Sequence, residues 1–332
     1  MGKKDKDKYE VVYASDDNFS SIMGVSITSL LENNKLKCID ITILDSGISP
    51  KNKNKINELV SRYRNVKIRF ILMNDLESRL GVNLSTDRGS LSQFSRLFIS
   101  SIFNEYEGRV LYLDCDTLIV NSIDGLMSLD IGDSVIAALK DAFSAHYRKN
   151  IGLEKNDIMF NSGVMLIDLK KWRDENVECK ILDFIREHEG KVQQGDQGIL
   201  NAILSRQTYV FEPKYNLVSI FFDLSYSDLI RYRGPINFYS EEKIEDSKKT
   251  PIIIHYTSSF YSTRPWNIKC NHKKKNDWLH YKDISPWKND EFLVKNNRNI
   301  LRTIIMAFPL KLVIVFASFF QRVVRPLTFK FK

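Results

Sequence analysis

RVLYLDCDTLIV, the run from Arg109 to Val120, is a nearly continuous series of apolar and β-branched residues that only its carboxylates interrupt. A run of this kind is typical of a central strand covered on both faces, because neither side of such a strand meets water. The sequence therefore predicts a buried sheet with helices packed on both sides. The two carboxylates, Asp114 and Asp116, stand where this predicted strand ends.

The segments before this run alternate between two patterns. Short stretches rich in β-branched residues are separated by helix-compatible stretches at about 20–33 and 50–63. The predicted strands are Tyr9–Ala14 (YEVVYA), Cys38–Leu44 (CIDITIL) and Val66–Leu72 (VKIRFIL). Such alternation predicts βαβ units and a mostly parallel sheet. A polar loop, Asn74–Gly89, then leads to Leu91–Phe103, whose apolar spacing is helical.

The segments after the run continue this plan. The sequence predicts, in chain order, a strand at Ser134–Leu139, a polar stretch at Asp141–Asp157 that would act as a lid, a strand at Met159–Leu169, helices at Lys170–His188 and Gln193–Ala202, an irregular aromatic region at Tyr209–Lys249 and a strand at Ile252–Tyr256. The whole order predicts an α/β protein with a Rossmann-like central sheet, mixed but mostly parallel and flanked by helices.

The net charge of +8 is concentrated at the end of the chain. Residues 291–332 contain eight Lys or Arg and one acidic residue, whereas residues 1–290 contain 41 basic and 40 acidic residues. A neutral body without a basic stripe argues against a nucleic-acid partner. The pattern predicts a body at 1–290 and a basic tail at 291–332 that associates with a membrane surface.

The tail also carries many apolar residues. Its segment Ile304–Phe320 is apolar apart from Lys311 and Ser318, but it is short for a membrane span and contains Pro309. Interleaved basic and aromatic residues favour a helix lying in the membrane interface. These residues are Arg298, Arg302, Lys311, Arg322, Arg325, Lys330 and Lys332, with Phe308, Phe316, Phe319, Phe320, Phe329 and Phe331. Packing of this helix on the protein's own core and a span through the membrane are the two alternatives.

The cysteines and the first residues predict a location. The four cysteines have no CxxC spacing and no pairing that suggests a disulfide framework, so they read as free thiols in a reducing compartment. The first eight residues, MGKKDKDK, are charged and do not form the apolar stretch of a secretory signal. We therefore expect a cytoplasmic protein that is peripheral on the inner face of the cell membrane.

Asp114 and Asp116 predict a metal site. In a strand, residues two apart point to the same side, so both carboxylates would face one point while Cys115 turns into the sheet. Two carboxylates held together in apolar surroundings repel each other unless a positive charge lies between them. Mn²⁺ or Mg²⁺, bound by one or two carboxylates and by diphosphate oxygens, suits this arrangement. A pair of capping or salt-bridged acids at a strand end is the alternative.

A second polar cluster, Asp16, Asp17 and Asn18, follows the first predicted strand. Ligands of open α/β sheets bind beyond the carboxyl ends of the strands, so this cluster could hold the base and ribose of a nucleotide. Helix capping is the alternative. The chain contains neither GxGxxG nor GxxxxGK[ST], so dinucleotide and P-loop chemistry lack their usual phosphate cradle.

Six motifs occur in an order and at spacings that resemble those of one enzyme family. They are ASDDNF (14–19), FSRLFI (94–99), VLYLDCDTLIV (110–120), FNSGVMLIDLKKWR (160–173), QGDQGILN (194–201) and HYTSSFYSTRPW (255–266). Over roughly residues 9–287 the chain is similar to glycosyltransferase family 8, the retaining transferases with a GT-A fold that include bacterial lipo-oligosaccharide galactosyltransferases. The resemblance implies a GT-A fold for the body.

The resemblance also implies a metal site and a nucleotide site. Asp114, Asp116 and His255 match the family's metal ligands, and a neutral imidazole is a suitable ligand beside two carboxylates. Arg264, which replaces a lysine of the family pattern, would neutralise the diphosphate. The positions that hold uridine, and an arginine near the donor, correspond to Ala14, Asp16, Asn18 and Arg96.

Four further positions match those that hold the donor sugar and line the reaction centre: Asp141, Asn161, Asp196 and Gln197. Sugar hydroxyls need such polar partners when they are buried. Outside the motif set, Asn161–Gly163 reads as a turn and Asp196 as a helix cap. Gln197 is a weak nucleophile and Asp196 is a candidate, so front-face substitution and a covalent intermediate both stay open.

The predicted reaction moves galactose or glucose from a UDP-hexose to a hydroxyl of a lipid-linked or cell-surface glycan. It needs Mn²⁺ or Mg²⁺ and retains the anomeric configuration. A sugar-nucleotide pyrophosphorylase is one alternative, but its glycine-rich basic loop is absent at Ser15–Asn18. A two-carboxylate glycosidase would need neither His255 nor a nucleotide. A membrane-binding module without catalysis is the remaining alternative.

Overall fold

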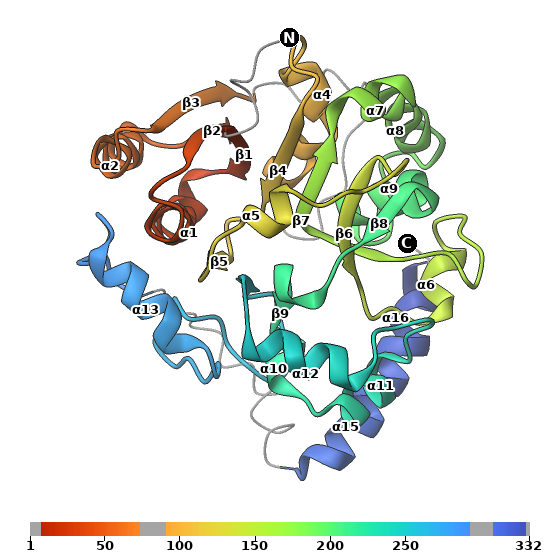
Figure 1. Ribbon diagram of the computed structural model, residues 1–332. Coiled ribbons are helices and arrows are strands. Elements are labelled where there is room, and N and C mark those ends of the chain that lie inside the picture. Colours follow the sequence, from red (N-terminus) through yellow and green to blue (C-terminus); the bar gives the residue numbers. More distant parts are fainter. Residues whose placement is uncertain (1–7, 74–90, 293–307, 330–332) are drawn as a thin grey trace.

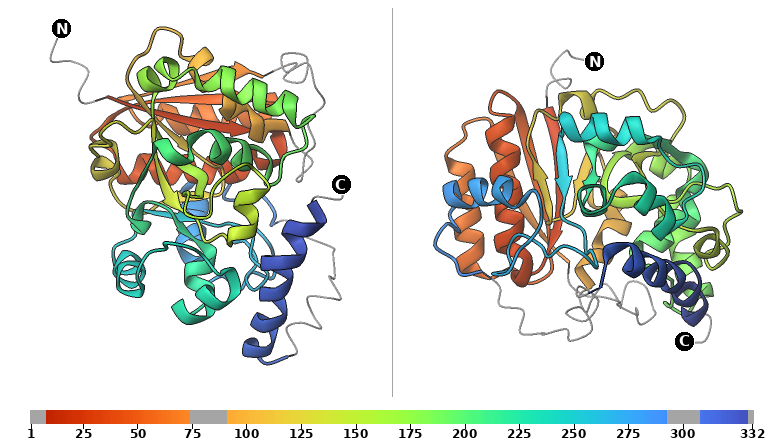
Figure 2. Two further views of the ribbon diagram at one scale, coloured as in Figure 1. Left: turned by 90° about the vertical axis from the view of Figure 1, so that its right-hand side faces the viewer. Right: turned by 90° about the horizontal axis from the view of Figure 1, so that it is seen from below.

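The computed structural model describes residues 8–73, 91–292 and 308–329. Its centre is a seven-stranded sheet of order β3-β2-β1-β4-β7-β6-β8, and a second sheet of three strands, β5-β10-β9, lies beside it. Helices cover both sides of the large sheet (Figures 1 and 2). The predicted mixed, mostly parallel sheet flanked by helices is confirmed.

The first part of the chain forms the predicted βαβ units. The elements are β1 (Lys8–Ser15), α1 (Ser20–Asn33), β2 (Cys38–Asp45), α2 (Pro50–Ser61) and β3 (Val66–Leu72), and their strands pair in parallel. Local signals set the start of α2: Ser49 caps the helix by accepting a hydrogen bond from the backbone N–H of Asn52, and Pro50 occupies the first turn. The predicted loop at 74–89 lies outside the described residues.

Strand direction brings several chain ends to one edge of the large sheet. The other strands are β4 (Arg109–Leu113), β6 (Ile136–Lys140), β7 (Phe160–Asp168) and β8 (Thr208–Val210). β1 pairs in parallel with β4, and β7 runs antiparallel to both β4 and β6. The carboxyl ends of β1, β4 and β6 therefore meet the start of β7 at the same edge, which is where open α/β sheets bind ligands.

The run from Arg109 to Val120 is not one strand, and this corrects the prediction. It breaks after β4, and its second half, β5 (Thr117–Ile119), joins the small sheet with β10 (Ile253–His255) and β9 (Leu217–Val218). Asp114–Asp116 is a turn, in which the Thr117 N–H donates to the Asp114 carbonyl at 3.1 Å. The two carboxylates converge because the chain turns there, not because strand residues alternate.

Other predicted segments are more broken than expected. The helix expected over Leu91–Phe103 is a 3₁₀ helix (η2, Leu91–Phe98) followed by a short α4 (Ile99–Ile102). The helix expected after β7 is divided into α7 (Leu169–Asp174) and α8 (Val177–Glu187) at Asn176, whose φ is 53°. The segment expected to act as a lid contains α6 (Ala145–Lys149) and is held down by the buried Arg148, which donates to the carbonyls of Phe143 and Asp157.

The irregular aromatic region contains several short elements. They are β9 with α10 (Ser219–Asp223), α11 (Tyr226–Arg233) and α12 (Glu241–Lys249). The helix α9 (Gly195–Leu204) precedes this region, and α13 (Lys275–Ile284) follows β10. A short α5 (Asp124–Met127) lies between β5 and β6.

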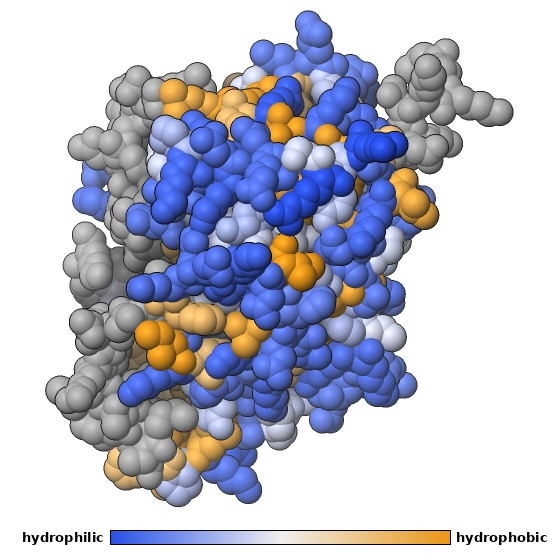
Figure 3. Space-filling view, turned by 90° about the vertical axis from the view of Figure 1, so that its left-hand side faces the viewer, coloured by the Kyte–Doolittle hydropathy of each residue, from blue (hydrophilic) through white to orange (hydrophobic). Residues whose placement is uncertain are grey.

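Apolar residues on the two faces of the large sheet form two cores. Along β1, Val11 and Tyr13 pack into the core that includes α1, whereas Val12 and Ala14 pack into the core on the other face. This follows from the strand period of two. The outer face that carries α2 and α13 is mostly hydrophilic, with small separate apolar patches (Figure 3).

The described part of the tail is one helical rod. α15 (Leu310–Phe319), a π-helical turn (η5, Phe320–Val324) and α16 (Arg325–Phe329) follow one another without a gap along one side of the molecule (Figure 2). α15 packs against α11, and the Ser318 hydroxyl donates to the Arg231 carbonyl at 2.7 Å. Within the described residues, no helix combines the length and the apolar character that a bilayer crossing requires.

Candidate active site

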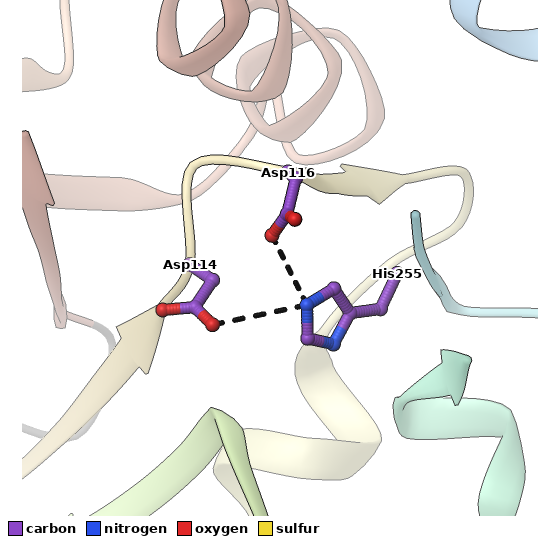
Figure 4. Close-up of side chains that lie close together, drawn as sticks. All are labelled: Asp114, Asp116 and His255. Carbon is purple, nitrogen blue, oxygen red and sulfur yellow. Dashed lines mark hydrogen bonds and ion pairs between the residues drawn. The ribbon is translucent and has the colours of Figure 1, made fainter. Parts of the chain in front are cut away.

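Three side chains from separate elements converge at the carboxyl edge of the large sheet. Asp114 follows β4, Asp116 lies in the turn before β5, and His255 ends β10 (Figure 4). The His255 Nε2 atom lies 3.0 Å from Asp116 Oδ1 and 3.8 Å from Asp114 Oδ2. One ligand atom from each of the three residues lies within 4.8 Å of the others, so the predicted metal ligands are brought together.

The hydrogen bonds behind His255 determine what its ring offers to this site. Asn216 donates from Nδ2 to Asn161 Oδ1 at 2.9 Å, so its own Oδ1 faces His255 Nδ1, also at 2.9 Å. That oxygen can only accept, so in the neutral imidazole the proton is on Nδ1 and Nε2 has the lone pair that a cation needs. In this tautomer Nε2 and the two carboxylates face one another. This donor set fits a divalent cation.

Gly163 makes room for the three ligands. It lies in β7 beside the turn, and its carbonyl accepts the Asp114 N–H at 2.8 Å. A Cβ at this position would lie 2.1 Å from His255 Cε1 and 2.7 Å from Asp114 Oδ2. Asn161–Gly163 is thus part of a strand and not a turn, and the glycine is required by the close approach of the histidine.

Two arginines flank the carboxylates. The buried Arg96 donates from Nη2 to Asp114 Oδ1 at 2.6 Å, and its Nε lies 3.1 Å from Asp196 Oδ2. Burial lowers the pKa of this guanidinium, but the charge of Asp114, with that of Asp196, outweighs burial and raises the pKa above its usual range. Arg264 Nη2 lies 3.1 Å from Asp116 Oδ2. Both predicted arginines therefore contact the carboxylates of the candidate metal site directly.

A cavity of about 530 Å³ opens onto this centre. Nine of the predicted site residues line it: Arg96, Asp114, Asp116, Asp141, Asn161, Asp196, Gln197, His255 and Arg264. Inside it, Gln197 donates from Nε2 to Asp141 Oδ2 at 3.4 Å, and Gln197 Oε1 accepts the Ser162 N–H at 3.3 Å. The cavity thus offers a cluster of carboxylate and amide groups beside the metal ligands, as a polyhydroxylated ligand requires.

Helix capping was the alternative interpretation of two of the acids, and the structure differs between them. Asp196 is the second residue of α9 and does not cap it; its carboxylate is paired with Arg96 instead. Asp16 does act as a cap, because its side chain accepts the N–H of Phe19 at 3.2 Å.

The predicted uridine positions lie next to the cavity and do not line it. Ala14 is buried at the end of β1, where its carbonyl accepts the Cys115 thiol at 3.2 Å, and Asn18 is exposed. Burial raises the pKa of the Cys115 thiol. The turned-in Cys115 was predicted, and it fixes the end of β1 against the Asp114–Asp116 turn. The roles of Ala14, Asp16 and Asn18 stay predictions.

A model of glycosyl transferase family 8 matches residues 10–270. The chain belongs to glycosyltransferase family 8. Among its relatives, General stress protein A of Bacillus subtilis strain 168 is 28% identical over 281 residues, which is 83% of this chain and 94% of that protein. Lipopolysaccharide 1,2-glucosyltransferase of Escherichia coli K12 is 26% identical over 283 residues, 84% of this chain and 79% of that protein.

Solved structures of the family share the fold. The crystal structure of the galactosyltransferase LgtC with donor and acceptor sugar analogs superimposes with a TM-score of 0.67 at 25% identity, covering 83% of this chain and 96% of that chain. The family 8 assignment decides against the pyrophosphorylase and glycosidase alternatives. It makes the chain a glycosyltransferase of the GT-A type.

Sequence reasoning missed several residues in and around this cavity. Asn216 gave no local signal, because a single asparagine before a short strand is common. Arg233, at the end of α11, and Arg325, at the start of α16, also line the cavity. Neither arginine was predicted, because Arg233 lies in a region expected to be irregular and Arg325 in a tail expected to lie outside the catalytic body.

Proposed function

We propose that this protein transfers a hexose, galactose or glucose, from a UDP-sugar to a hydroxyl of a lipid-linked or cell-surface glycan, with Mn²⁺ or Mg²⁺ and with retention of configuration. The observation that carries this proposal is the convergence of Asp114, Asp116 and His255 in a polar cavity of a family 8 protein. When bound there, the divalent cation would supply a positive charge that stabilises the leaving diphosphate.

The surrounding residues support departure of a diphosphate. Arg264 and Arg96 bring two permanent positive charges beside Asp116 and Asp114. A fixed cation at the place where negative charge grows lowers the barrier without reorganisation. In the proposed reaction, Arg264 therefore neutralises the leaving UDP, and Arg96 holds the Asp114 carboxylate in place.

The geometry of the proposed reaction centre favours front-face substitution. Asp196 is held in an ion pair with Arg96, which reduces its strength as a nucleophile. Gln197 is oriented by Asp141 and by the backbone of Ser162, so its amide can position the donor sugar. We infer that Asp196 and Gln197 orient the sugar and that the acceptor oxygen attacks on the face from which UDP leaves.

The first test is release of UDP from a panel of UDP-hexoses, with Mn²⁺ and with a chelator. We expect one donor to be hydrolysed only with metal, and Asp116→Ala to lose at least 100-fold in rate, because a metal ligand and the partner of Arg264 are removed together. Asp130→Ala, at an exposed site, is the matched control. Binding of no UDP-sugar in the presence of Mn²⁺ would contradict the proposal and would favour a module without catalysis.

We further propose that the tail rests on the inner surface of the membrane and that the acceptor is presented there. The rod packs on the body with the face that includes Ile314 and Gln321, and it exposes a second apolar face. The exposed apolar side chains of the rod are Leu312, Val315, Phe316, Phe319, Phe320 and Leu327, and Phe308 is exposed just before it. Lys311 and Arg322 are exposed on the same rod. Apolar and basic groups together suit an anionic membrane interface.

A further inference from the structure

The cavity has a second cationic wall that the proposed donor site does not use. Arg233 ends α11, Arg325 begins α16, and both side chains line the cavity that contains the metal ligands. α11 and α16 lie across the molecule from β1 and α1, where the nucleotide is expected (Figures 1 and 2). The tail rod is therefore part of the cavity wall as well as a surface helix.

These two arginines have no acidic partners in the described part of the chain. Neither forms an ion pair with a described carboxylate, and the buried Nε of Arg233 has no hydrogen-bond partner there. The Arg233 guanidinium lies over the rings of Phe143 and Tyr232, at 5.8 and 5.1 Å from their centroids. Arg325 Nη1 contacts a neutral amide, Gln321 Oε1, at 3.4 Å. Their charges are thus available to a ligand.

The positive charges of Arg233 and Arg325 act on the same side chain, Tyr147. Burial raises the pKa of the Tyr147 hydroxyl, and the positive charges of Arg325 and Arg233 oppose that rise. Tyr147 donates to the Gln321 carbonyl at 3.0 Å, so it joins α6 to the tail rod. Both guanidinium groups therefore lie near the point where α6, α11 and the rod meet.

Hydrogen bonds tie this wall to the proposed sugar site. Asn150 donates to the Pro326 carbonyl at 2.8 Å and to Gln193 Oε1 at 2.7 Å. Gln193 lies just before α9, which carries Asp196 and Gln197. The position of Arg325 is thereby fixed relative to the reaction centre, as recognition of a bound substrate requires.

We propose that Arg233 and Arg325 form a subsite for an oxyanion, a phosphate or a carboxylate, on the acceptor glycan. The inference rests on the proposed transferase function and specifies the acceptor class. The diphosphate of the donor already has Arg264 and the metal centre, whereas an anionic acceptor would find its counter-charge on this second wall. Arginine suits the role because its planar fork binds oxyanions through paired N–H groups.

The test is a binding titration on the full chain saturated with UDP and Mn²⁺, which fills the donor site before the probe is added. The probes are methyl glucoside, its 6-phosphate and methyl glucuronide, so that a neutral, a phosphate and a carboxylate form are compared. We expect an anionic probe to bind about tenfold more tightly than the neutral one, as one charge-assisted hydrogen bond would give. Whichever anion shows the larger preference identifies the acceptor's charged group.

Substitutions assign the preference to the two arginines. Arg325→Gln and Arg233→Gln should each reduce it to about threefold or less, while UDP binding and Mn²⁺-dependent donor hydrolysis are kept. Lys311→Gln, which removes the same charge from an exposed site on the rod outside the cavity, should leave the preference intact. Arg325 is itself exposed, so its variant keeps the test valid if the Arg233 variant fails to fold.

Several results would overturn the inference. Equal binding of the three probes, or no binding of any, would show that the subsite does not exist. A weaker UDP affinity in Arg325→Gln would assign the arginine to the donor. If Arg325→Gln lost binding to vesicles with 30% anionic phospholipid and kept the probe preference, Arg325 would be assigned to lipid headgroups. A failure of the transferase proposal is seen separately, because UDP would then not bind in the first step.

Discussion

At the scale of single residues, Asn216 orients the candidate metal ligand His255 through Nδ1, the ring nitrogen that does not face the two carboxylates. It accepts the imidazole Nδ1 proton and donates to Asn161, so it sets both the tautomer and the ring plane. We expect Asn216→Ala to weaken Mn²⁺ binding by about 10- to 100-fold, as loss of such an outer partner does elsewhere. Electron paramagnetic resonance of free Mn²⁺ measures this. Asn54→Ala on the exposed side of α2 is the control, and unchanged Mn²⁺ affinity in a folded Asn216 variant would contradict the assignment.

His272 is expected to make stability depend on pH. Burial, with the charges of Lys273 and Lys274, lowers the pKa of this histidine from 6.5 to about 4. Between these values the unfolded chain binds more protons than the folded one, so stability is complete above about pH 6.5 and falls as the pH is lowered toward 4. The loss is at most ~3 kcal/mol. The measurement is urea unfolding at pH 7.5 and at pH 5. Between these pH values the free energy of unfolding should fall less in His272→Gln than in the native protein. His146→Gln, at an exposed site, should lose as much as the native protein.

At the scale of elements, the tail rod has one face that packs on the body and one that is exposed, whereas the sequence predicted a tail separate from the body. One face packs on α11 and α6, and the other exposes apolar side chains such as Phe316, which is 76% exposed. A deletion of the whole tail would therefore remove a cavity wall as well as the surface helix. Point substitutions on the outer face separate the two effects.

Replacing Phe316 and Phe319 together by serine should weaken binding to anionic vesicles by about 10- to 100-fold, because two largely exposed rings lose their insertion energy. Donor hydrolysis should persist, since neither ring lines the cavity. Flotation with vesicles measures the first effect. The control is Leu36→Ser with Ile268→Ser, two exposed apolar residues on the body. Equal vesicle binding by both double variants would count against the membrane role of the rod.

At the scale of the whole molecule, ligand binding should be coupled to stability. Asp114, Asp116 and His255 come from both sheets, so a cation and UDP that bind there hold the two sheets together. A ligand at 100 times its dissociation constant adds about 2.7 kcal/mol to the free energy of unfolding, which corresponds to a rise of several degrees in melting temperature. Thermal unfolding with Mn²⁺ and UDP should show this rise, and chelator or Asp116→Ala should abolish it. A rise that survives chelator would place UDP at another site.

The sequence by itself determined the α/β class, the alternation of strands and helices over the first three strands and, through the motif set, the family. The same motifs named Asp114, Asp116 and His255, which the structure brings together. β-branched runs and helical spacing indicate which residues are buried, and the motif set indicates the family. Neither inference needs coordinates. The tail's apolar and basic character was equally visible in its composition.

Only the tertiary structure decided how distant segments meet. The break at Asp114–Asp116, the approach of Gly163 to His255, the Asn216 hydrogen bonds and the place of Arg325 in the cavity wall all depend on packing between elements far apart in the chain. Periodicity describes one segment at a time and carries no distance between two segments. The contacts that shape the site form only when the two sheets and the tail rod pack together.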